Sequence, residues 1–389
     1  LFNLAWTDPS FLETEPLASL VAKGEGFEEA DKEILFGEHL RIIQEVTAIH
    51  HLLWETGQIE VTTTPLAHPI LPLIFDSATA TQGDPAAIMP DIRFREGRDA
   101  QEHVERGLDV AERLLTRRPV GMWPGEGAVS QLTVPIFSGK GVEWIATGED
   151  VLAPSLDIGD FDRDEDGTVI EADLLYRPWK VVPTRQPELP IFFRDGLLSD
   201  LVGFEYSGTD ADLAAEDFMS RLQDIADRLD EQRAQGPHIV SVILDGENAW
   251  EHYPNDGIDF LRALYGRLAE ADFITTITPS EYLAAFGDTV EPLESLWPGA
   301  WFSSNYATWI GEEEEATGWE YLWEVRDDLK GFEGEVSDEA YAAAYETMLF
   351  AEGSDWFWWY GDDQSSGNDD YFDAAFRELL GQVYDALEA

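Results

Sequence analysis

Helices and short apolar strands alternate along the chain up to about residue 280, and this alternation limits the folds that are open to it. Helical periodicity covers residues 31–55, 99–117, 210–234 and 259–270. Short β-branched or apolar runs, with the length and composition of strands, cover residues 59–64, 238–244 and 273–277. Alternating elements of these two kinds predict an α/β fold with a parallel sheet, either a barrel or a doubly wound sheet.

Residues 238–244 form the strongest predicted strand, because they follow a Gly-Pro helix stop and are almost continuously apolar. A continuous apolar run is typical of a parallel strand that is covered on both faces. Beyond residue 285 the sequence is mostly helical and rich in tryptophan, with one helix expected over residues 337–352. We therefore divide the chain into an α/β domain, residues 1–285, and a C-terminal helical domain, residues 286–389.

The net charge is the most unusual property of the composition, since 79 Asp and Glu residues against 24 Lys and Arg give −55. The acidic residues are spread along the whole chain, whereas a patch for a cationic partner would predict a cluster. We interpret the charge as adaptation to a solvent of high salt concentration, in which self-repulsion is screened. Nucleic acid is excluded as a partner because binding phosphates requires a basic surface.

Cysteines and membrane-spanning runs are both missing from the sequence. Without cysteine, disulfides and thiolate chemistry are excluded. No apolar run approaches the roughly 20 residues that cross a bilayer, so we expect no membrane partner. The first residues, LFNLAW, have neither an initiator Met nor the layout of a signal peptide, and we expect them to lie inside a longer protein. The cytoplasm of a salt-accumulating organism and secretion both agree with these properties.

Two carboxylates follow predicted strands and have tryptophans close by in the sequence. Asp245 comes directly after residues 238–244, and Glu126 follows a short apolar stretch near Trp123, between two glycines. In parallel α/β folds the active site lies at the carboxyl ends of the strands. A pair of carboxylates with indoles that stack on sugar rings is typical of glycoside cleavage. On local pattern alone, Asp245 could equally cap a helix N-terminus, and each tryptophan could belong to the core.

Several segments resemble the conserved regions of glycoside hydrolase family 57, most closely its amylopullulanase branch. The segments are residues 57–72 (GQIEVTTTPLAHPILP), 121–130 (GMWPGEGAVS), 245–248 (DGEN), 352–359 (EGSDWFWW), 192–195 (FFRD) and 202–208 (VGFEYSG). The resemblance runs over essentially all 389 residues. It implies a seven-stranded (β/α) barrel followed by a C-terminal, mainly helical region that contributes to the active site.

The resemblance also implies roles for individual residues. Glu126 matches the family's nucleophile and Asp245 its acid/base, which cleave α-glucans with retention of configuration by a double displacement. Asp355 matches an aspartate that supports the nucleophile. The residues expected to bind the sugar are His68, Trp123, Trp250, Asp355 and Trp358. A purely structural histidine is the alternative for His68, and core packing is the alternative for each tryptophan. This chemistry needs no metal or other cofactor.

One feature of the family has no counterpart in this sequence. The family begins with a strand that ends in a His-Gln-Pro motif, whose histidine lines the sugar site, and nothing here matches it. We therefore expect the barrel to be incomplete at its N-terminus, without its first strand. A separate N-terminal segment of the same protein would be the partner that completes it.

An acidic segment just after residue 160 has the spacing of an EF-hand calcium loop. It reads DRDEDGTVIEAD, with glycine at the sixth position and an apolar residue at the eighth. The expected ligands of a structural calcium ion are Asp162, Asp164, Asp166, Thr168 and Asp173. A chain this acidic produces the DxDxDG pattern by chance more often than usual, so chance is the alternative.

Three functions stay open on the sequence. The first is hydrolysis of α-1,4 and α-1,6 links in starch, glycogen or pullulan. The second is α-glucan transglycosylation, as in branching enzymes or glucanotransferases, which would use the same two carboxylates. The third is a non-catalytic glucan-binding fragment, suggested by the missing first region. A metal-dependent carbohydrate deacetylase would need an Asp with two His ligands, and the seven histidines lack that spacing.

Overall fold

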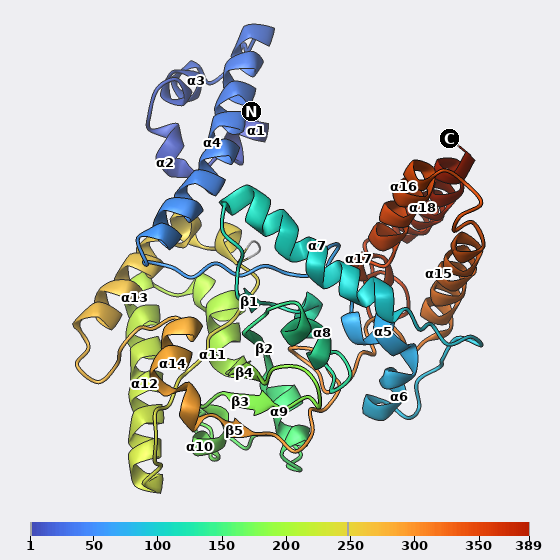
Figure 1. The fold of residues 1–389 in the computed structure, drawn as a ribbon. Helices are drawn as coiled ribbons and strands as arrows, with labels where there is room; N and C mark the ends of the chain where they lie inside the picture. The colour runs from blue at the N-terminus through green and yellow to red at the C-terminus, as the bar shows by residue number, and fades with distance from the viewer. Residues whose placement is uncertain (1, 247–248, 389) are drawn as a thin grey trace.

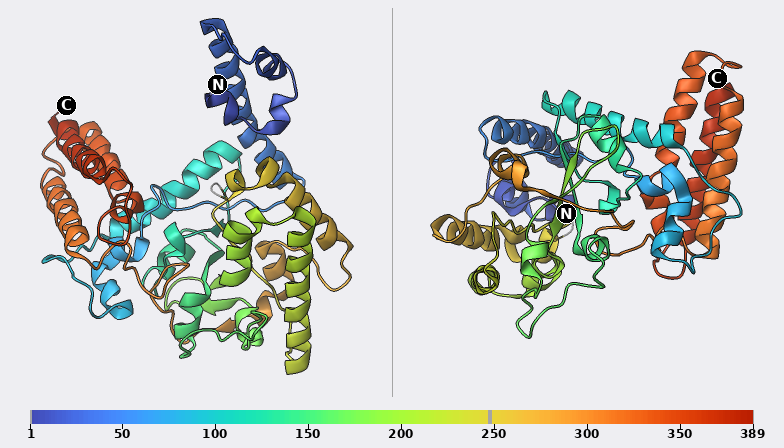
Figure 2. Two further views of the ribbon diagram at one scale, coloured as in Figure 1. Left: turned by 180° about the vertical axis from the view of Figure 1, so that it is seen from behind. Right: turned by 60° about the horizontal axis from the view of Figure 1, so that its bottom comes forward.

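The computed structural model describes residues 2–246 and 249–388 and has three regions (Figure 1). An α/β body lies at the centre, a group of N-terminal helices projects from it, and C-terminal helices form a lobe beside it (Figures 1 and 2). The strands are β1 (Gly121–Met122), β2 (Trp144–Gly148), β3 (Trp179–Val181), β4 (Leu189–Arg194) and β5 (Glu291–Pro292).

The helices differ widely in length. The longer ones are α4 (Glu29–Glu55), α7 (Gly97–Leu115), α12 (Ala211–Gln232), α13 (Ile258–Glu270), α15 (Glu313–Gly331), α16 (Asp338–Ala351) and α18 (Asp369–Glu388). The shorter ones are α1 (Phe2–Ala5), α2 (Pro9–Leu12), α3 (Leu17–Lys23), α5 (Leu71–Asp76), α6 (Ala80–Gly83), α8 (Val134–Gly139), α9 (Glu149–Ser155), α10 (Ala172–Leu175), α11 (Gly196–Asp200), α14 (Pro279–Phe286) and α17 (Ser354–Trp358). The helices predicted over residues 31–55, 99–117, 210–234, 259–270 and 337–352 are confirmed, with ends that differ by one or two residues.

The body is built on a five-stranded sheet with the order β1-β2-β4-β3-β5. β1, β2 and β4 run parallel, with Met122 opposite Ile145, whereas β3 runs antiparallel to β4. Single parallel bridges join Thr63 to Met122 and Arg194 to Ser241. Five chain segments therefore run in the same direction, and their carboxyl ends lie at one edge. This parallel-rich α/β architecture agrees with the predicted fold class.

The expected strand at residues 238–244 differs from the prediction. These residues are half-buried and lie outside the strands, and among the described positions they pair with β4 only through Ser241. Residues 239–244 line one cavity, and most of them also line a second cavity, so neither face of the segment is fully covered. Residues 59–64 likewise pair only at Thr63, and residues 273–277 lie outside the described strands. The seven strands of a complete barrel are not found in the described parts of the chain.

One continuous cluster of buried side chains joins the body to the C-terminal lobe. It includes Ile145 and Ile191 of the sheet, Trp319 of α15 and Phe376 of α18. The lobe is thus held by shared packing and not by a linker. As a result, side chains near the start of α17 reach the carboxyl edge of the sheet.

Helix α4 projects from the body and leaves most of its apolar stripe in solvent (Figures 1 and 2). Leu35 and Trp54 are buried, whereas Ile34, Leu40, Ile43, Val46 and Ile49 are 42–65% exposed. The periodicity predicted the helix correctly but not this exposure. No helix in the described residues combines the length and apolarity that spanning a bilayer requires.

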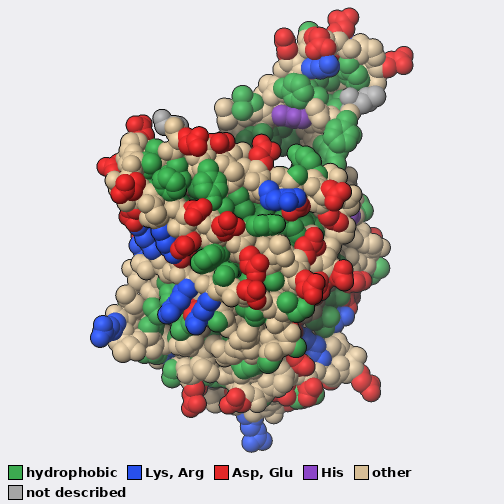
Figure 3. Space-filling view, turned by 90° about the vertical axis from the view of Figure 1, so that its right-hand side faces the viewer, with side chains coloured by type: hydrophobic (Ala, Val, Ile, Leu, Met, Phe, Trp, Pro, Cys, Tyr) green, Lys and Arg blue, Asp and Glu red, His purple; other side chains and the backbone are tan. Residues whose placement is uncertain are grey.

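The acidic side chains are distributed over the surface. On the face drawn in Figure 3, Asp and Glu are scattered from the projecting helices to the opposite end, and Lys and Arg are fewer. Several of the basic residues form ion pairs with carboxylates, such as Arg118 with Glu105, Asp109 and Glu112. On this face the acidic side chains are therefore not gathered in a single patch.

Candidate active site

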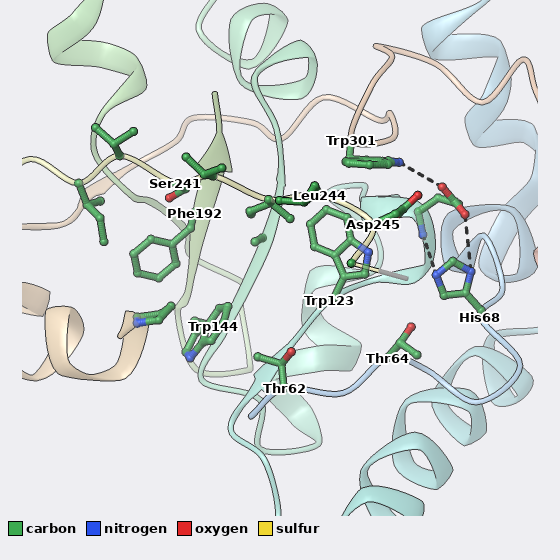
Figure 4. Close-up of a pocket in the computed structure, with 18 of the residues that line it drawn as sticks. Thr62, Thr64, His68, Trp123, Trp144, Phe192, Ser241, Leu244, Asp245 and Trp301 are labelled. Carbon is green, nitrogen blue, oxygen red and sulfur yellow. Dashed lines mark hydrogen bonds and ion pairs between the residues drawn. The ribbon is translucent and has the colours of Figure 1, made fainter. Parts of the chain in front are cut away.

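Loops that follow the parallel segments meet in one pocket of about 790 Å³ (Figure 4). His68, Glu126 and Asp245 all line this pocket. His68 follows Thr63 by five residues, and Thr63 is bridged in parallel to β1. Glu126 and Asp245 each come four residues after another position paired in parallel, Met122 and Ser241 respectively. Because carboxyl ends of parallel strands share one edge, residues far apart in the sequence converge there. The two carboxylates predicted to act together therefore lie in the same cavity.

Glu126 is held in an unusual backbone conformation. Its φ is 52°, in the left-handed region that non-glycine residues rarely occupy. The preceding residue, Gly125, lies so close to the neighbouring loop that an added Cβ would be 2.5 Å from the Pro69 carbonyl oxygen. Strain of this kind persists only where the surroundings fix it, and it clusters at functional sites.

Trp301 binds Glu126 through both its backbone and its side chain. The indole Nε1–H donates to Glu126 Oε2 at 3.1 Å, and the backbone N–H donates to the Glu126 carbonyl at 3.0 Å. Two glycines permit this approach, since an added Cβ on Gly148 or Gly127 would lie 1.9 or 2.7 Å from atoms of Trp301. The indole N–H holds Oε2 in place, while Oε1 faces the ring of His68 (Figure 4).

His68 faces Glu126 from a left-handed turn of its own. Ala67 and His68 have φ values of 57° and 53°. The Glu126 backbone N–H donates to His68 Nε2 at 3.3 Å, while Nδ1 lies 3.1 Å from Ser354 Oγ and 3.8 Å from Glu126 Oε1. Because Nε2 accepts a hydrogen bond, the neutral ring carries its proton on Nδ1. His68 thus presents an N–H to Ser354 and to the carboxylate.

Of the other predicted sugar-binding residues, two line the pocket. Trp123 lies against Trp301 with ring centroids 5.8 Å apart and planes at 87°, and Asp355 of α17 is exposed in the pocket wall. Asp245 lies on the same side of the pocket as Trp301 and His68 (Figure 4). Residues 247 and 248, part of the motif that begins at Asp245, lie outside the described residues.

Trp250 and Trp358 are not brought to this pocket. Trp250 packs on Tyr253 at 5.4 Å and lines a second, apolar cavity of about 540 Å³ bordered by α12 and α13. Trp358 packs on Trp309 at 5.7 Å and on Phe302. Both indoles are half-buried among other aromatic rings. The core-packing alternative therefore describes these two better than stacking on a sugar in this pocket.

Sequence reasoning missed several residues of the site. Trp301 lies in an irregular segment without a strand or motif to mark it, and Ser354 is the unremarked neighbour of Asp355. Hydroxyl side chains of Thr62 and Thr64 also line the pocket. The signal that was available for Trp301 is indirect, since Gly127 and Gly148 need a partner that approaches closely.

The predicted calcium loop has its main carboxylates engaged by cations. Asp164 accepts the backbone N–H groups of Asp166 and Thr168 at 3.0 Å each and forms an ion pair with Arg228. Asp173 pairs with Arg177 and lies 2.8 Å from His238 Nε2. Within residues 2–246 and 249–388, no group of three or more His, Asp or Glu side chains that could hold a metal ion is found, at Asp162 or elsewhere. This arrangement does not fit calcium unless these pairs separate, and the calcium site stays a prediction.

A parallel-rich α/β fold with carboxylates and indoles at its carboxyl edge is typical of carbohydrate-cleaving enzymes. The model of glycosyl hydrolase family 57 matches residues 2–293, and the chain belongs to this family. A search of curated protein sequences found no match.

Several solved structures share the fold, and two of them are described as family 57 branching enzymes. They include a branching enzyme from Thermococcus kodakaraensis, with a TM-score of 0.67 at 15% identity over 95% of this chain and 74% of that one. A branching enzyme from Pyrococcus horikoshii has a TM-score of 0.65 at 17% identity over 91% and 74%. The α-amylase from Thermotoga maritima has a TM-score of 0.59 at 17% identity over 98% and 77%. At these identities the likeness shows a common fold.

Proposed function

We propose that this protein is a retaining glycoside hydrolase that acts on α-glucans, with Glu126 as nucleophile and Asp245 as acid/base. The observation that carries the proposal is their convergence in one pocket, although 119 positions separate them in the chain. The similar structures are described as branching enzymes and as an α-amylase, which supports an α-glucan as the substrate class.

The proposed reaction has two steps. Glu126 attacks the anomeric carbon and forms a covalent glycosyl-enzyme, while Asp245 gives its proton to the departing glycosidic oxygen. Asp245 then removes a proton from water, whose oxygen displaces Glu126 and restores its carboxylate. Trp301 and His68 would hold the nucleophile during both steps, since each contacts its carboxyl group through a ring nitrogen. None of these steps requires a metal.

Within the family we propose the amylopullulanase-like specificity that the sequence motifs suggest, with cleavage of α-1,4 and α-1,6 links. Transglycosylation uses the same first step, and the second step then uses a sugar hydroxyl in place of water. A similar structure described as a 4-α-glucanotransferase, with a TM-score of 0.56 at 14% identity, keeps this alternative open. The nature of the acceptor therefore separates the two activities.

The experiment that tests the proposal measures turnover of pullulan, amylose and glycogen in molar KCl, by wild type, Glu126→Gln and Asp245→Asn. New reducing ends would indicate hydrolysis, and rearranged chains without them would indicate transfer. We expect Glu126→Gln to lower kcat by roughly 10³-fold or more, because the covalent step is lost. Proton NMR of the first product should show retention at the anomeric carbon.

Two results would contradict the proposal. If the product has inverted configuration, Glu126 is not a nucleophile. If wild type binds amylopectin without turnover and Glu126→Gln binds it equally well, the protein is a glucan-binding module. Glu143→Gln, at a position outside the pocket lining, provides the matched control for removing one acidic charge.

A further inference from the structure

The turn that carries His68 is held from behind by residues that do not line the pocket. The Leu66 carbonyl accepts from His103 Nδ1 at 2.6 Å, and the Leu66 N–H donates to the His103 carbonyl at 2.9 Å. On the other side of the turn, the Ser354 N–H donates to the His68 carbonyl at 3.2 Å. The left-handed conformation of Ala67 and His68 is therefore fixed at both ends.

Close backbone packing reinforces this hold. A Cβ on Gly107 of α7 would lie 2.2 Å from the Thr64 carbonyl oxygen, and a Cβ on Gly353 would lie 2.8 Å from the Ala67 carbonyl oxygen. The helix that carries His103 and the segment that carries Ser354 thus both press directly on residues 64–68. Larger side chains at either glycine would displace the turn.

His103 itself is fully buried and is paired at both ring nitrogens. Its Nε2 lies 2.8 Å from Glu352 Oε2, and both side chains have no exposed surface. Burial lowers the pKa of His103 to about 4, so the ring is neutral near pH 7. Since a carbonyl can only accept, Nδ1 carries the ring proton and donates to Leu66, and Nε2 accepts from Glu352. Glu352 is therefore protonated, in agreement with a pKa that burial and the neighbouring charge of Asp99 raise well above its ordinary value.

A buried ion pair joins α7, the helix that carries His103, to the C-terminal lobe. Arg326 of α15 binds Asp99 of α7 through two hydrogen bonds, of 2.6 and 3.0 Å, and Tyr345 of α16 donates to the same carboxylate at 2.7 Å. All three side chains are buried. A buried network of this kind is weak evidence for stability, because apolar side chains of the same volume could fill the space as well. Because the network lies behind the turn that carries His68, it can hold that turn in position.

We propose that His103 is a positioning residue for the reaction: through the Leu66 carbonyl it fixes the turn that presents His68 to Glu126, and Glu352 fixes His103. The inference rests on the proposed function of Glu126. It adds to that function a group that never touches the substrate and acts through the geometry of another residue. The chain of contacts is continuous, from Glu352 through His103, Leu66 and His68 to Glu126.

A matched pair of variants separates positioning from simple stability. The amide of Asn can occupy the place of His Nδ1, and that of Gln the place of Nε2. His103→Asn therefore keeps a donor for Leu66, whereas His103→Gln keeps only the contact with Glu352. We expect His103→Gln to lower kcat by about 10- to 100-fold with little change in KM, and His103→Asn to stay within about threefold of wild type. Both are assayed well below their melting temperatures.

A second readout does not depend on turnover. The ¹⁵N chemical shifts of the His68 ring report which nitrogen carries the proton, and His68→Gln assigns this signal among the seven histidines. Wild type and His103→Asn should show a proton on Nδ1, and His103→Gln should show a mixture. If wild type has no activity on glucans, the proposed function fails, while the tautomer of His68 still decides the positioning role.

The outcome that overturns the inference is clear in both readouts. Equal kcat values for the two His103 variants, or an unchanged His68 tautomer in His103→Gln, would reduce His103 to a structural residue. If His103→Gln does not fold, the comparison moves to Glu352→Gln, which still donates to His103, and Glu352→Met, which cannot. The inference then requires that only Glu352→Met alters kcat and the tautomer.

Discussion

Glu315 offers a test of electrostatics in this structure, because it is an acid with no exposed surface. It lies in the first turn of α15, where its Oε2 accepts the Glu312 N–H at 3.0 Å, and no partner is found for Oε1 among the described residues. Burial, together with the nearby charges of Asp363 and Glu312, raises its pKa from 4.5 to about 8. The folded protein therefore holds a proton that the unfolded chain has already released at neutral pH.

The sign of the effect follows from linkage. Below pH 4.5 the carboxyl group is protonated in both the folded and the unfolded state, so it does not change the free energy of unfolding with pH. Between pH 4.5 and about pH 8 the folded state binds the extra proton, so stability falls as pH rises. At 1.36 kcal/mol for each unit of pKa, the loss grows by about 3 kcal/mol between pH 5.5 and pH 8.5. Glu315→Gln removes the titration and keeps the shape of the side chain.

The assay is urea unfolding at constant KCl concentration, followed by tryptophan fluorescence at pH 5.5, 7 and 8.5. The difference in free energy of unfolding between Glu315→Gln and wild type should rise in favour of the variant by about 3 kcal/mol over this range. Any constant offset from the new amide cancels in this slope. Glu313→Gln, in the same turn but exposed, should show no such slope. A difference for Glu315→Gln that stays flat within about 0.5 kcal/mol would refute the reasoning.

Three further predictions concern the site, the solvent and the acidic loop. Trp301→Phe keeps an aromatic ring but removes the hydrogen-bond donor to Glu126. We expect kcat/KM to fall by about 10-fold or more, since a hydrogen bond to a charged group contributes about 1.5–3 kcal/mol. An unchanged kcat/KM would show that the indole does not hold the carboxylate. Raising KCl from 0.1 M to molar concentrations should raise the melting temperature of a chain with net charge −55, and a flat response would exclude salt adaptation. In the loop around Asp164, the predicted calcium site means that calcium should raise the melting temperature of wild type but not of Asp164→Ala, which should itself melt lower through the lost turn and Arg228 contacts. Calcium that leaves the melting temperature of both proteins unchanged would exclude the site.

The sequence predicted the long helices well because their signal is local. Periodicity and stop residues define α12 and α13 without reference to the rest of the chain. Strands were predicted less well, since an apolar run becomes a strand only where neighbours pair with it. Residues 238–244 have the composition of a buried strand but adjoin two cavities, so most of their backbone is left outside the sheet.

The site residues that the sequence predicted are likewise those with a local signal. Glu126, Asp245, His68, Trp123 and Asp355 were found because each belongs to a recognisable motif and lies after a sheet position or at a helix start. Trp301 belongs to no motif and follows no strand. It reaches the carboxylate because Gly127 and Gly148 have no side chain to keep it away, and only the folded structure shows this. The tryptophans at 250 and 358 had motif positions as good as that of Trp123, but aromatic neighbours in the core hold them elsewhere.

The hydrogen bond between His68 and Ser354 joins residues that are 286 positions apart. Contacts over such distances form late in folding, because the intervening loop must first be closed and its entropy lost. During synthesis, His68 emerges from the ribosome well before Ser354, the residue that holds its ring and its carbonyl. The turn that carries His68 therefore gains these contacts only after α17 has been made and has docked. A chain that stops short of residue 354 would keep Glu126 and Asp245 and still lack the contacts that hold His68 beside the nucleophile.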